Sequence, residues 1–335
     1  MIEIRNCPSS LVEGFDTYSP KSAKLLFGKT KVNPILGFDI DELRNADEIA
    51  DAMHRISVSG VQEKFPAIIN GNAINIAGDN DRSTHILKPA PWNKTLRDRK
   101  MMPANEHLTM QIASQIYGIL TTANGLCFTP KGQPVYITRR FDILPDGSKL
   151  PMEDFASIIG RNEQTAGLQF KYNGSYEDIA KAIRANVAAW MVDMERFFEL
   201  VVFNYIYANG NAHLKNFSLI LDGQDYRLAP AYDLINTGLH INGSDFGLDG
   251  GLASDIEKSD VYDRTGHPCR PDFYRFGKKI GLVTKRIDRI LNKYTNFPKE
   301  AKRLVDRSFL SDKLKRNYIR IVNERISRFN RSSEM

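Results

Sequence analysis

Cysteine is scarce in this sequence, with Cys7, Cys127 and Cys269 spread over 335 residues. Three distant thiols provide neither a disulfide framework nor a zinc-ligand spacing, and they are compatible with a reducing compartment. Long hydrophobic runs are absent too: the most apolar stretch, residues 197–207, is far shorter than the roughly 20 residues of a membrane-spanning helix. The opening MIEIRNCPSS lacks the apolar core of a signal peptide. We therefore expect a cytoplasmic protein with no membrane partner.

The sequence has no internal repeat and no low-complexity segment. Hydrophobic residues make up 42% of it and charged residues 26%, a composition too apolar for a disordered chain. A chain of 335 residues can bury a large core and form either one large domain or two lobes.

Charge is divided unevenly along the chain. Residues 275–331 contain 18 Lys and Arg against 5 Asp and Glu, a balance of +13, so the net charge of +6 leaves −7 for the remainder. A basic segment suggests a polyanionic partner, such as a nucleic acid or an acidic protein surface. Apolar residues nevertheless recur at helix spacing in 280–291 and in 314–326, which predicts packed helices with basic solvated faces. We favour the helices and keep a nucleic-acid-binding or scaffolding protein as the alternative function.

Two patterns divide the chain near residue 142. Before it, short apolar runs bounded by turn residues predict strands, which are expected at residues 65–69, 73–77, 84–88 and 135–141. Helix periodicity predicts helices at 41–56, 105–117, 175–191 and 194–209, and a second hairpin at 216–221 and 226–231. The sequence therefore predicts an α+β fold, with a strand-rich N-terminal lobe over 1–142, a mainly helical C-terminal lobe over 143–335 and a cleft between them.

The most informative stretch joins the apolar helix at 194–209 to the second hairpin. Phosphoryl transfer requires a group that orients the acceptor hydroxyl and oxygen ligands that hold Mg²⁺. In protein kinases the orienting residue and an Asn ligand lie five residues apart, and a metal-binding Asp follows a short hairpin. Asn211 and Asn216 have this spacing, and Asp233 follows the hairpin. The alternative is a polar loop in which an Asn caps the neighbouring helix and His213 is a satisfied hydrogen-bond partner.

Further candidates lie in the predicted N-terminal lobe. Residues 57–64 combine small residues with one glycine, so they could cover phosphates through backbone N–H groups, although they match neither a GxGxxG nor a Walker A loop. Lys88 could neutralise nucleotide phosphates, or be a surface lysine at a strand end. Glu106 could pair with Lys88 or favour the start of its helix.

Taken together, these segments resemble the HipA family of toxin–antitoxin serine/threonine kinases. Seven matching segments occur in the family's order: 57–64, 86–88, 105–107, 140–142, 153–155, 213–216 and 230–233. The predicted phosphate-covering loop begins near residue 57, which leaves little room for the N-terminal subdomain of longer members. This feature is similar to the shorter HipT branch, in which a separate small protein supplies that subdomain and acts as antitoxin.

The resemblance implies a bilobal protein-kinase-like fold that binds ATP and Mg²⁺ between its lobes. It implies the following roles: Lys88 contacts the phosphates, Arg139 and Phe141 line the adenine side, Ser57, Val58, Ser59 and Gly60 cover the phosphates, Asn216 and Asp233 hold metal, and His213 and Lys215 support the catalytic loop and the γ-phosphate.

The resemblance also implies a target and a form of regulation. Family members phosphorylate aminoacyl-tRNA synthetases, the tryptophanyl enzyme in the HipT branch, and thereby inhibit translation. They bind small antitoxin proteins, one of which binds DNA, so that contact with DNA would be indirect. They also autophosphorylate the phosphate-covering loop, where Ser57 and Ser59 offer hydroxyls. A phosphate there adds about −1.5 to −2 charges beside the nucleotide, which would repel it.

One residue departs from the family pattern at the centre of the site. Asn211 stands where the family has the catalytic Asp, and an amide can hydrogen-bond a hydroxyl but cannot accept its proton. We therefore expect this chain to bind ATP and to transfer phosphate very poorly. A small-molecule phosphotransferase with the same fold class is a third possible function.

Overall fold

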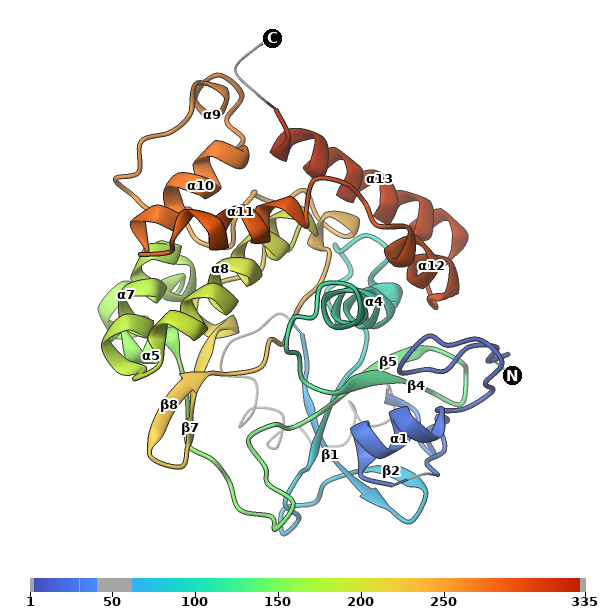
Figure 1. Cartoon of the computed structure of the whole chain (residues 1–335). Coiled ribbons are helices and arrows are strands. Elements are labelled where there is room, and N and C mark those ends of the chain that lie inside the picture. The colour runs from blue at the N-terminus through green and yellow to red at the C-terminus, as the bar shows by residue number, and fades with distance from the viewer. Residues whose placement is uncertain (1–2, 30, 41–61, 332–335) are drawn as a thin grey trace.

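The computed structural model describes residues 3–29, 31–40 and 62–331, which form a strand-rich part and a helical part (Figure 1). The predicted helix at 41–56 lies outside these residues. The first part contains a five-stranded antiparallel sheet in the order β2-β1-β3-β5-β4. Its strands are β1 (Phe65–Asn70), β2 (Ala73–Ile76), β3 (His85–Lys88), β4 (Asn124–Phe128) and β5 (Pro134–Arg139).

The predicted hairpin forms with the expected turn. Asn70 pairs with Ala73, and Gly71 adopts a φ of 61°, a left-handed conformation that glycine reaches without strain. The other predicted strands also form, whereas β4 was not predicted. It opens with Asn124 and Gly125, two residue types that are depleted in strands.

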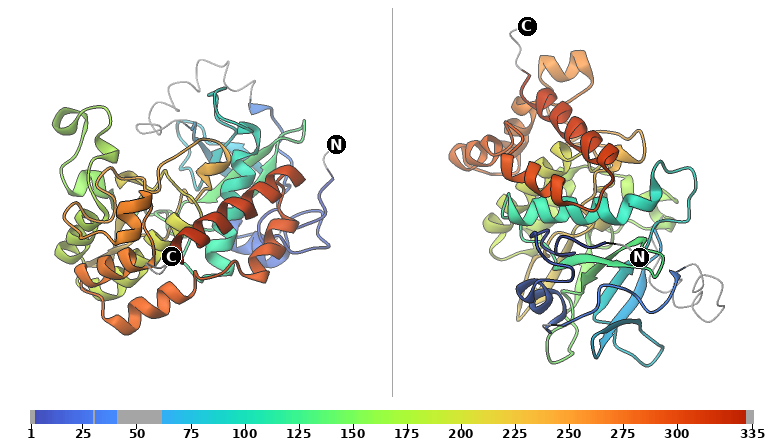
Figure 2. Two further views of the ribbon diagram at one scale, coloured as in Figure 1. Left: turned by 90° about the horizontal axis from the view of Figure 1, so that it is seen from above. Right: turned by 90° about the vertical axis from the view of Figure 1, so that its right-hand side faces the viewer.

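Helices cover both faces of this sheet. α1 (Pro20–Phe27) packs Leu26 and Phe27 against Leu87 and Ile137 on one face. α4 (Met102–Gln115) packs on the other face and begins three residues before the predicted 105, with a proline in its first turn. Most of α4 is buried because it lies between the sheet and the C-terminal helices (Figure 2).

The second part is mainly helical, as predicted, and is organised around α8 (Trp190–Ile206), which is buried along most of its length. The other helices are α5 (Phe155–Ile158), α6 (Glu163–Ala166), α7 (Tyr176–Asn186), α9 (Asp260–Thr265), α10 (Arg270–Lys279), α11 (Thr284–Asn292), α12 (Lys299–Arg307) and α13 (Asp312–Phe329), with 3-10 turns η1 (Arg99–Met101), η2 (Phe170–Tyr172), η3 (Leu214–Asn216) and η4 (Thr237–Leu239). A small sheet of β6 (Met152–Asp154), β7 (Ser218–Asp222) and β8 (Asp225–Leu228) contains the second predicted hairpin.

The helix predicted over 175–191 ends earlier than expected. α7 stops at Asn186 and α8 starts at Trp190, although no proline or glycine separates them. The predicted helix over 280–291 likewise starts later, at Thr284, because Gly281 adopts a φ of 93° after α10.

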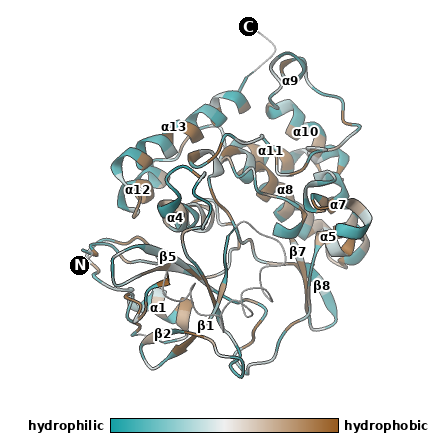
Figure 3. Cartoon of the chain, turned by 180° about the vertical axis from the view of Figure 1, so that it is seen from behind, coloured by the Kyte–Doolittle hydropathy of each residue, from teal (hydrophilic) through white to brown (hydrophobic). Residues whose placement is uncertain are grey.

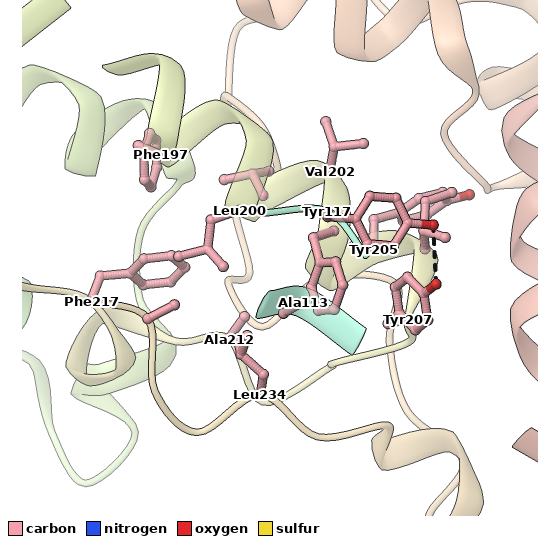
Figure 4. Close-up of a cluster of buried hydrophobic side chains, with 14 of the residues drawn as sticks. Ala113, Tyr117, Phe197, Leu200, Val202, Tyr205, Tyr207, Ala212, Phe217 and Leu234 are labelled. Carbon is pink, nitrogen blue, oxygen red and sulfur yellow. Dashed lines mark hydrogen bonds between the residues drawn. The ribbon is translucent and has the colours of Figure 1, made fainter. Parts of the chain in front are cut away.

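Aromatic side chains join α8 to the strand-rich part. Tyr117 follows α4, stacks on Tyr294 with ring centroids 4.6 Å apart, and accepts a 3.0 Å hydrogen bond from Tyr207 (Figure 4). These buried contacts extend from α4 into the helices that follow α8, so both parts share one hydrophobic core.

The basic C-terminal segment forms packed helices, as the favoured interpretation predicted. Hydrophilic and hydrophobic residues alternate along α12 and α13 (Figure 3), and most of the hydrophobic residues of these two helices are buried. Several of the basic side chains pair with acidic groups on α8: Arg286 and Arg289 contact Glu195, and Lys293 contacts Glu199. Across the described residues, no helix has the length and apolar character needed to cross a membrane.

Candidate active site

Lys88 at the end of β3 is the cation at the centre of the site. Successive residues of a strand face opposite sides, so Leu87 packs toward α1 while Lys88 faces α4. Its Nζ donates to Glu106 Oε1 on α4 at 2.6 Å and also to Asp233 Oδ1. Lys88 is therefore a buried, paired lysine and not a surface residue, and Glu106 pairs with it.

Asp233 connects the two parts of the chain through its carboxylate. Lys64, just before β1, donates to the second oxygen, Oδ2, at 3.3 Å. Burial alone would raise the pKa of Asp233, but the positive charges of Lys64 and Lys88 outweigh it and hold that pKa well below its usual range. Asp233 also has a φ of 57°, a strained conformation for a non-glycine residue, and such strain often occurs at functional sites.

The loop with Asn211 is fixed by its neighbours. The side chain of Asn209 donates to Asn204 Oδ1 at 3.0 Å and to the Asp233 carbonyl at 3.3 Å, which ties the loop to the Asp233 segment. Asn216 Nδ2 donates to the carbonyl of Asn211 at 2.6 Å. The two residues at the predicted five-residue spacing are thus in direct contact.

Tyr176 and Gly247 hold the backbone of this loop without lining the cavity. Tyr176 on α7 donates its hydroxyl to the carbonyl of Ala212 at 3.0 Å and accepts from the backbone N–H of Gly247 at 3.3 Å. A Cβ atom at Gly247 would lie 2.5 Å from backbone atoms of Ala212, so only glycine allows this approach.

His213 and Lys215 follow Asn211 in the same loop and contact Tyr172 and Asp154, respectively. The His213 ring meets Tyr172 edge-on at 5.2 Å, and burial together with nearby Lys171 lowers the pKa of His213 to about 3, which keeps it neutral. Lys215 Nζ pairs with Asp154 Oδ2 at 3.0 Å. Lys215 therefore contacts the small sheet.

A cavity of about 390 Å³ brings five of the twelve predicted site residues together, and Lys215 is not among the residues that line it. Groups from both parts of the chain line it, and they are Lys64, Lys88, Glu106, Asn211, His213, Asn216 and Asp233. The polar groups needed for anion and cation binding thus converge on one space.

Other predicted residues lie apart from this group. Arg139 donates to the Leu25 carbonyl of α1 at 3.2 Å and does not line the cavity. Phe141 stacks on Tyr232 with ring centroids 5.9 Å apart, which places it beside the Asp233 segment. Four predicted residues lie outside the described part of the chain: Ser57, Val58, Ser59 and Gly60.

The residues that sequence reasoning missed act through long-range contacts. Lys64 was placed only at the end of a loop motif, and its partner is 169 positions away. Asn209, Tyr176 and Gly247 position the loop without touching the cavity. Gly247 gave no distinct local signal, because Gly243, Gly250 and Gly251 lie close to it in the sequence.

The donor set fits a magnesium ion. Asp233 contributes an ionised carboxylate, and the amide nitrogen of Asn216 is used within the loop, which leaves its oxygen for a cation. Mg²⁺ typically takes one or two protein oxygens and completes its shell with water and substrate phosphates. No cluster of three or more His, Cys, Asp or Glu that could hold a metal occurs in the described ranges. A magnesium site with one carboxylate and one amide oxygen does not require such a cluster.

Comparison with known proteins gives a consistent result. Residues 56–301 match the model of the HipA-like C-terminal domain. The chain is 27% identical over 197 residues to "Putative kinase Y4mE" of Sinorhizobium fredii, covering 55% of this chain and 43% of that protein. It is 24% identical over 257 residues to the serine/threonine-protein kinase toxin HipA of Shewanella oneidensis, covering 68% of this chain and 55% of that protein. The chain thus spans about half the length of these two relatives.

A solved structure supports the fold. The Shewanella oneidensis HipA chain, determined in a complex with HipB and operator DNA, superposes with a TM-score of 0.62 at 17% identity. The superposition covers 82% of this chain and 65% of that one. The chain therefore has the bilobal kinase-like fold that the sequence predicted.

Proposed function

The chain belongs to the family of HipA-like C-terminal domains, and we propose that it is an ATP-dependent serine/threonine protein kinase toxin of a toxin–antitoxin system. One observation carries this proposal: Lys88, paired with Glu106, shares a cavity with Asp233, Asn216 and Asn211. A buried Lys–Glu pair beside two oxygen ligands and a hydroxyl-orienting residue is the arrangement that phosphoryl transfer requires.

Each group has a role in this proposal. Lys88 contacts the nucleotide phosphates, and Asn216 and Asp233 hold Mg²⁺, which neutralises charge that develops on the phosphoryl group. Phe141, which stacks on Tyr232, would line the site of the adenine ring of ATP. His213 stays neutral and supports the loop. We place the boundary between the lobes at residues 142 and 143.

Asn211 limits the reaction in our proposal. The acceptor oxygen forms a bond to the γ-phosphorus, the bond from that phosphorus to the β,γ-bridging oxygen breaks, and ADP leaves with the electron pair. The acceptor proton needs a base, and the Asn211 amide cannot take it. We propose that the chain binds ATP and transfers phosphate poorly for this reason.

Restoring the base tests the proposal. Asn211→Asp should raise transfer of radiolabelled phosphate from ATP by at least about 100-fold, the lower range of what general-base catalysis contributes. The added Asp233→Asn substitution should abolish the gain, since it removes the ionised metal ligand. Equal, low labelling of the parent chain and Asn211→Asp, with ATP binding intact in both, would refute the assignment of Asn211.

We propose Ser57 and Ser59 as autophosphorylation sites, because the resemblance places them in the phosphate-covering loop. Phosphopeptide mapping of the Asn211→Asp variant tests them, with Ser57→Ala and Ser59→Ala as controls. If both single variants and the double variant keep the full label, both sites are refuted.

The target and partners follow from the family. We propose an aminoacyl-tRNA synthetase as the substrate, with the tryptophanyl enzyme favoured, and inhibition of translation as the result. Small antitoxin proteins are proposed as partners, one of them DNA-binding, since the Shewanella oneidensis HipA was solved with HipB and operator DNA. Phosphoproteomics of cells that express the Asn211→Asp variant should identify the target, and a phosphorylated set without any synthetase would refute it.

A further inference from the structure

A second cavity, of about 930 Å³, adjoins the candidate active site. It lies between the segment that follows Asp233 and helix α13, and Ile241 lines both this cavity and the one that contains Lys88 and Asp233. The phosphoryl-transfer roles proposed above use none of its charged residues. We define this second cavity as the groove; its charged lining residues are Asp245, Asp249, Lys258, Arg320, Glu324, Arg325 and Arg328, and His267 lines it as well.

The groove reaches the loop that contains Asn211. A Cβ atom at Gly210 would lie 3.1 Å from the carbonyl oxygen of Ser244, which lines the groove, and Gly210 directly precedes Asn211. Ala208, at the start of the same loop, also lines the groove. A polypeptide that places a hydroxyl at Asn211 would therefore have its flanking residues at the groove.

Helix α13 presents charge where a buried helix face is ordinarily apolar. Arg325 and Arg328 face Asp245, with 10% and 20% of their side chains exposed. The Asp245 carboxylate accepts from Arg325, lies 3.5 Å from Arg328, and its second oxygen is 2.7 Å from His267. Buried charge is costly, so a cluster of this kind beside a cavity is a candidate for binding.

The donors of the cluster exceed its acceptors. Each guanidinium carries five N–H groups, and Asp245 and Glu324 together supply four carboxylate oxygens to Arg325, Arg328, Arg320 and His267. Exposed Lys258 adds a further cation and exposed Asp249 a further carboxylate, so the groove lining has four Lys and Arg against three Asp and Glu. Arginine forks bind carboxylates in a bidentate way, which favours an occupant that carries several of them.

We propose that the groove docks an acidic segment of the protein acceptor, close in sequence to the hydroxyl that is phosphorylated. This inference deepens the kinase function proposed above and rests on it for the identity of the occupant. The groove, with a volume of about 930 Å³, admits a short stretch of polypeptide.

The test uses the full chain and a fluorescein-labelled peptide of eight glutamates, measured by anisotropy without nucleotide. Arg328→Gln should weaken binding at least about tenfold, which corresponds to about 1.4 kcal/mol. Arg316→Gln is the matched control, because Arg316 is exposed on the same helix and does not line the groove. Lys258→Gln provides a second groove variant at an exposed position, in case Arg328→Gln unfolds, and should weaken binding at least threefold.

Two results would overturn the proposal. One is equal loss of peptide affinity in the groove variants and in Arg316→Gln, which would indicate general attraction to a basic surface. The other is tighter, groove-dependent binding of a single-stranded oligonucleotide of equal charge, which would make the occupant a nucleic acid.

A kinetic readout separates this inference from the kinase assignment. In the Asn211→Asp background, Arg328→Gln should raise the KM for an acidic serine peptide and leave the kcat and the KM for ATP unchanged. Groove-dependent peptide binding without any phosphate transfer would support the groove and refute the kinase assignment. Phosphate transfer that does not depend on Arg328 would support the kinase assignment and refute the groove.

Discussion

Replacing Lys88 with methionine should destabilise the fold by an amount that depends on pH. Lys88 and Glu106 have 4% and 2% of their side chains exposed, and their N–O distance is 2.6 Å. Methionine fills a similar volume, so the main loss is the charge. Glu106 would remain buried beside Asp233, which is itself ionised and retains Lys64 as its partner.

The protonation of Glu106 sets an upper limit on the cost. Burial raises the pKa of Glu106 and the attraction of Lys88 offsets only part of this, so without Lys88 the carboxyl would take up a proton in the folded state. Protonating a carboxyl with an ordinary pKa of about 4.3 costs about 3.7 kcal/mol at pH 7 and about 1 kcal/mol at pH 5. A raised folded pKa means that stability is retained at low pH and lost as pH rises. We therefore expect Lys88→Met to cost about 3–4 kcal/mol at pH 7, as for other broken buried pairs.

Urea unfolding at pH 7 and pH 5 measures this difference. The double variant Lys88→Met with Glu106→Gln should recover most of the stability at pH 7, since replacing both partners of a buried pair costs little. Arg316→Gln is a control for loss of an exposed charge and should change the free energy of unfolding by less than about 0.5 kcal/mol. A penalty for Lys88→Met that is equal at both pH values would show that Glu106 does not carry the charge assigned to it.

Three further predictions concern the surroundings of the site. Gly247→Ala should cost about 1–3 kcal/mol in urea unfolding, because its methyl group would overlap the backbone of the loop, whereas Gly37→Ala, with no atom within 4 Å, should cost almost nothing. Asn105→Ala should cost about 1–3 kcal/mol, since Asn105 Nδ2 donates to the buried Asn236 carbonyl at 2.8 Å, and an unchanged urea midpoint would refute this. Burial lowers the pKa of His107 to about 4, so the stability that its neutral form contributes is complete above pH 6.5 and should fall by about 1.4 kcal/mol per pH unit as the pH drops toward 4. The free energy of unfolding of His107→Gln should depend less on pH over this range. Parallel pH dependences of the parent chain and the variant would contradict this prediction.

Features that local sequence determines were predicted well. The turn at Gly71 set the register of β1 and β2, because few residues other than glycine favour its conformation. The five-residue spacing of Asn211 and Asn216 brought the two residues into contact, since a short loop cannot separate them far. The sequence offered Glu106 either as a partner of Lys88 or as a residue that favours the start of its helix, and the structure shows the pair.

Features that depend on distant segments were not predicted. The contact of Lys64 with Asp233 depends on how the two parts of the chain meet, and hydrophobic periodicity contains no information on this. The break between α7 and α8 falls in Val187-Ala188-Ala189, which has no local stop signal. Tertiary packing overrides helix propensity there.

The identity of residue 211 is separable from the shape of its loop. Asn211 contributes to the loop through its backbone carbonyl, which accepts from Asn216, while Asn209 and Tyr176 hold the neighbouring backbone. None of these bonds uses the Asn211 side chain. A carboxylate and an amide of nearly equal size would therefore occupy the same position in an unchanged loop. The chemistry can differ by one proton acceptor while the fold, the cavity and the proposed metal ligands stay the same, so a sequence motif that predicts this loop correctly does not by itself predict that the loop is active.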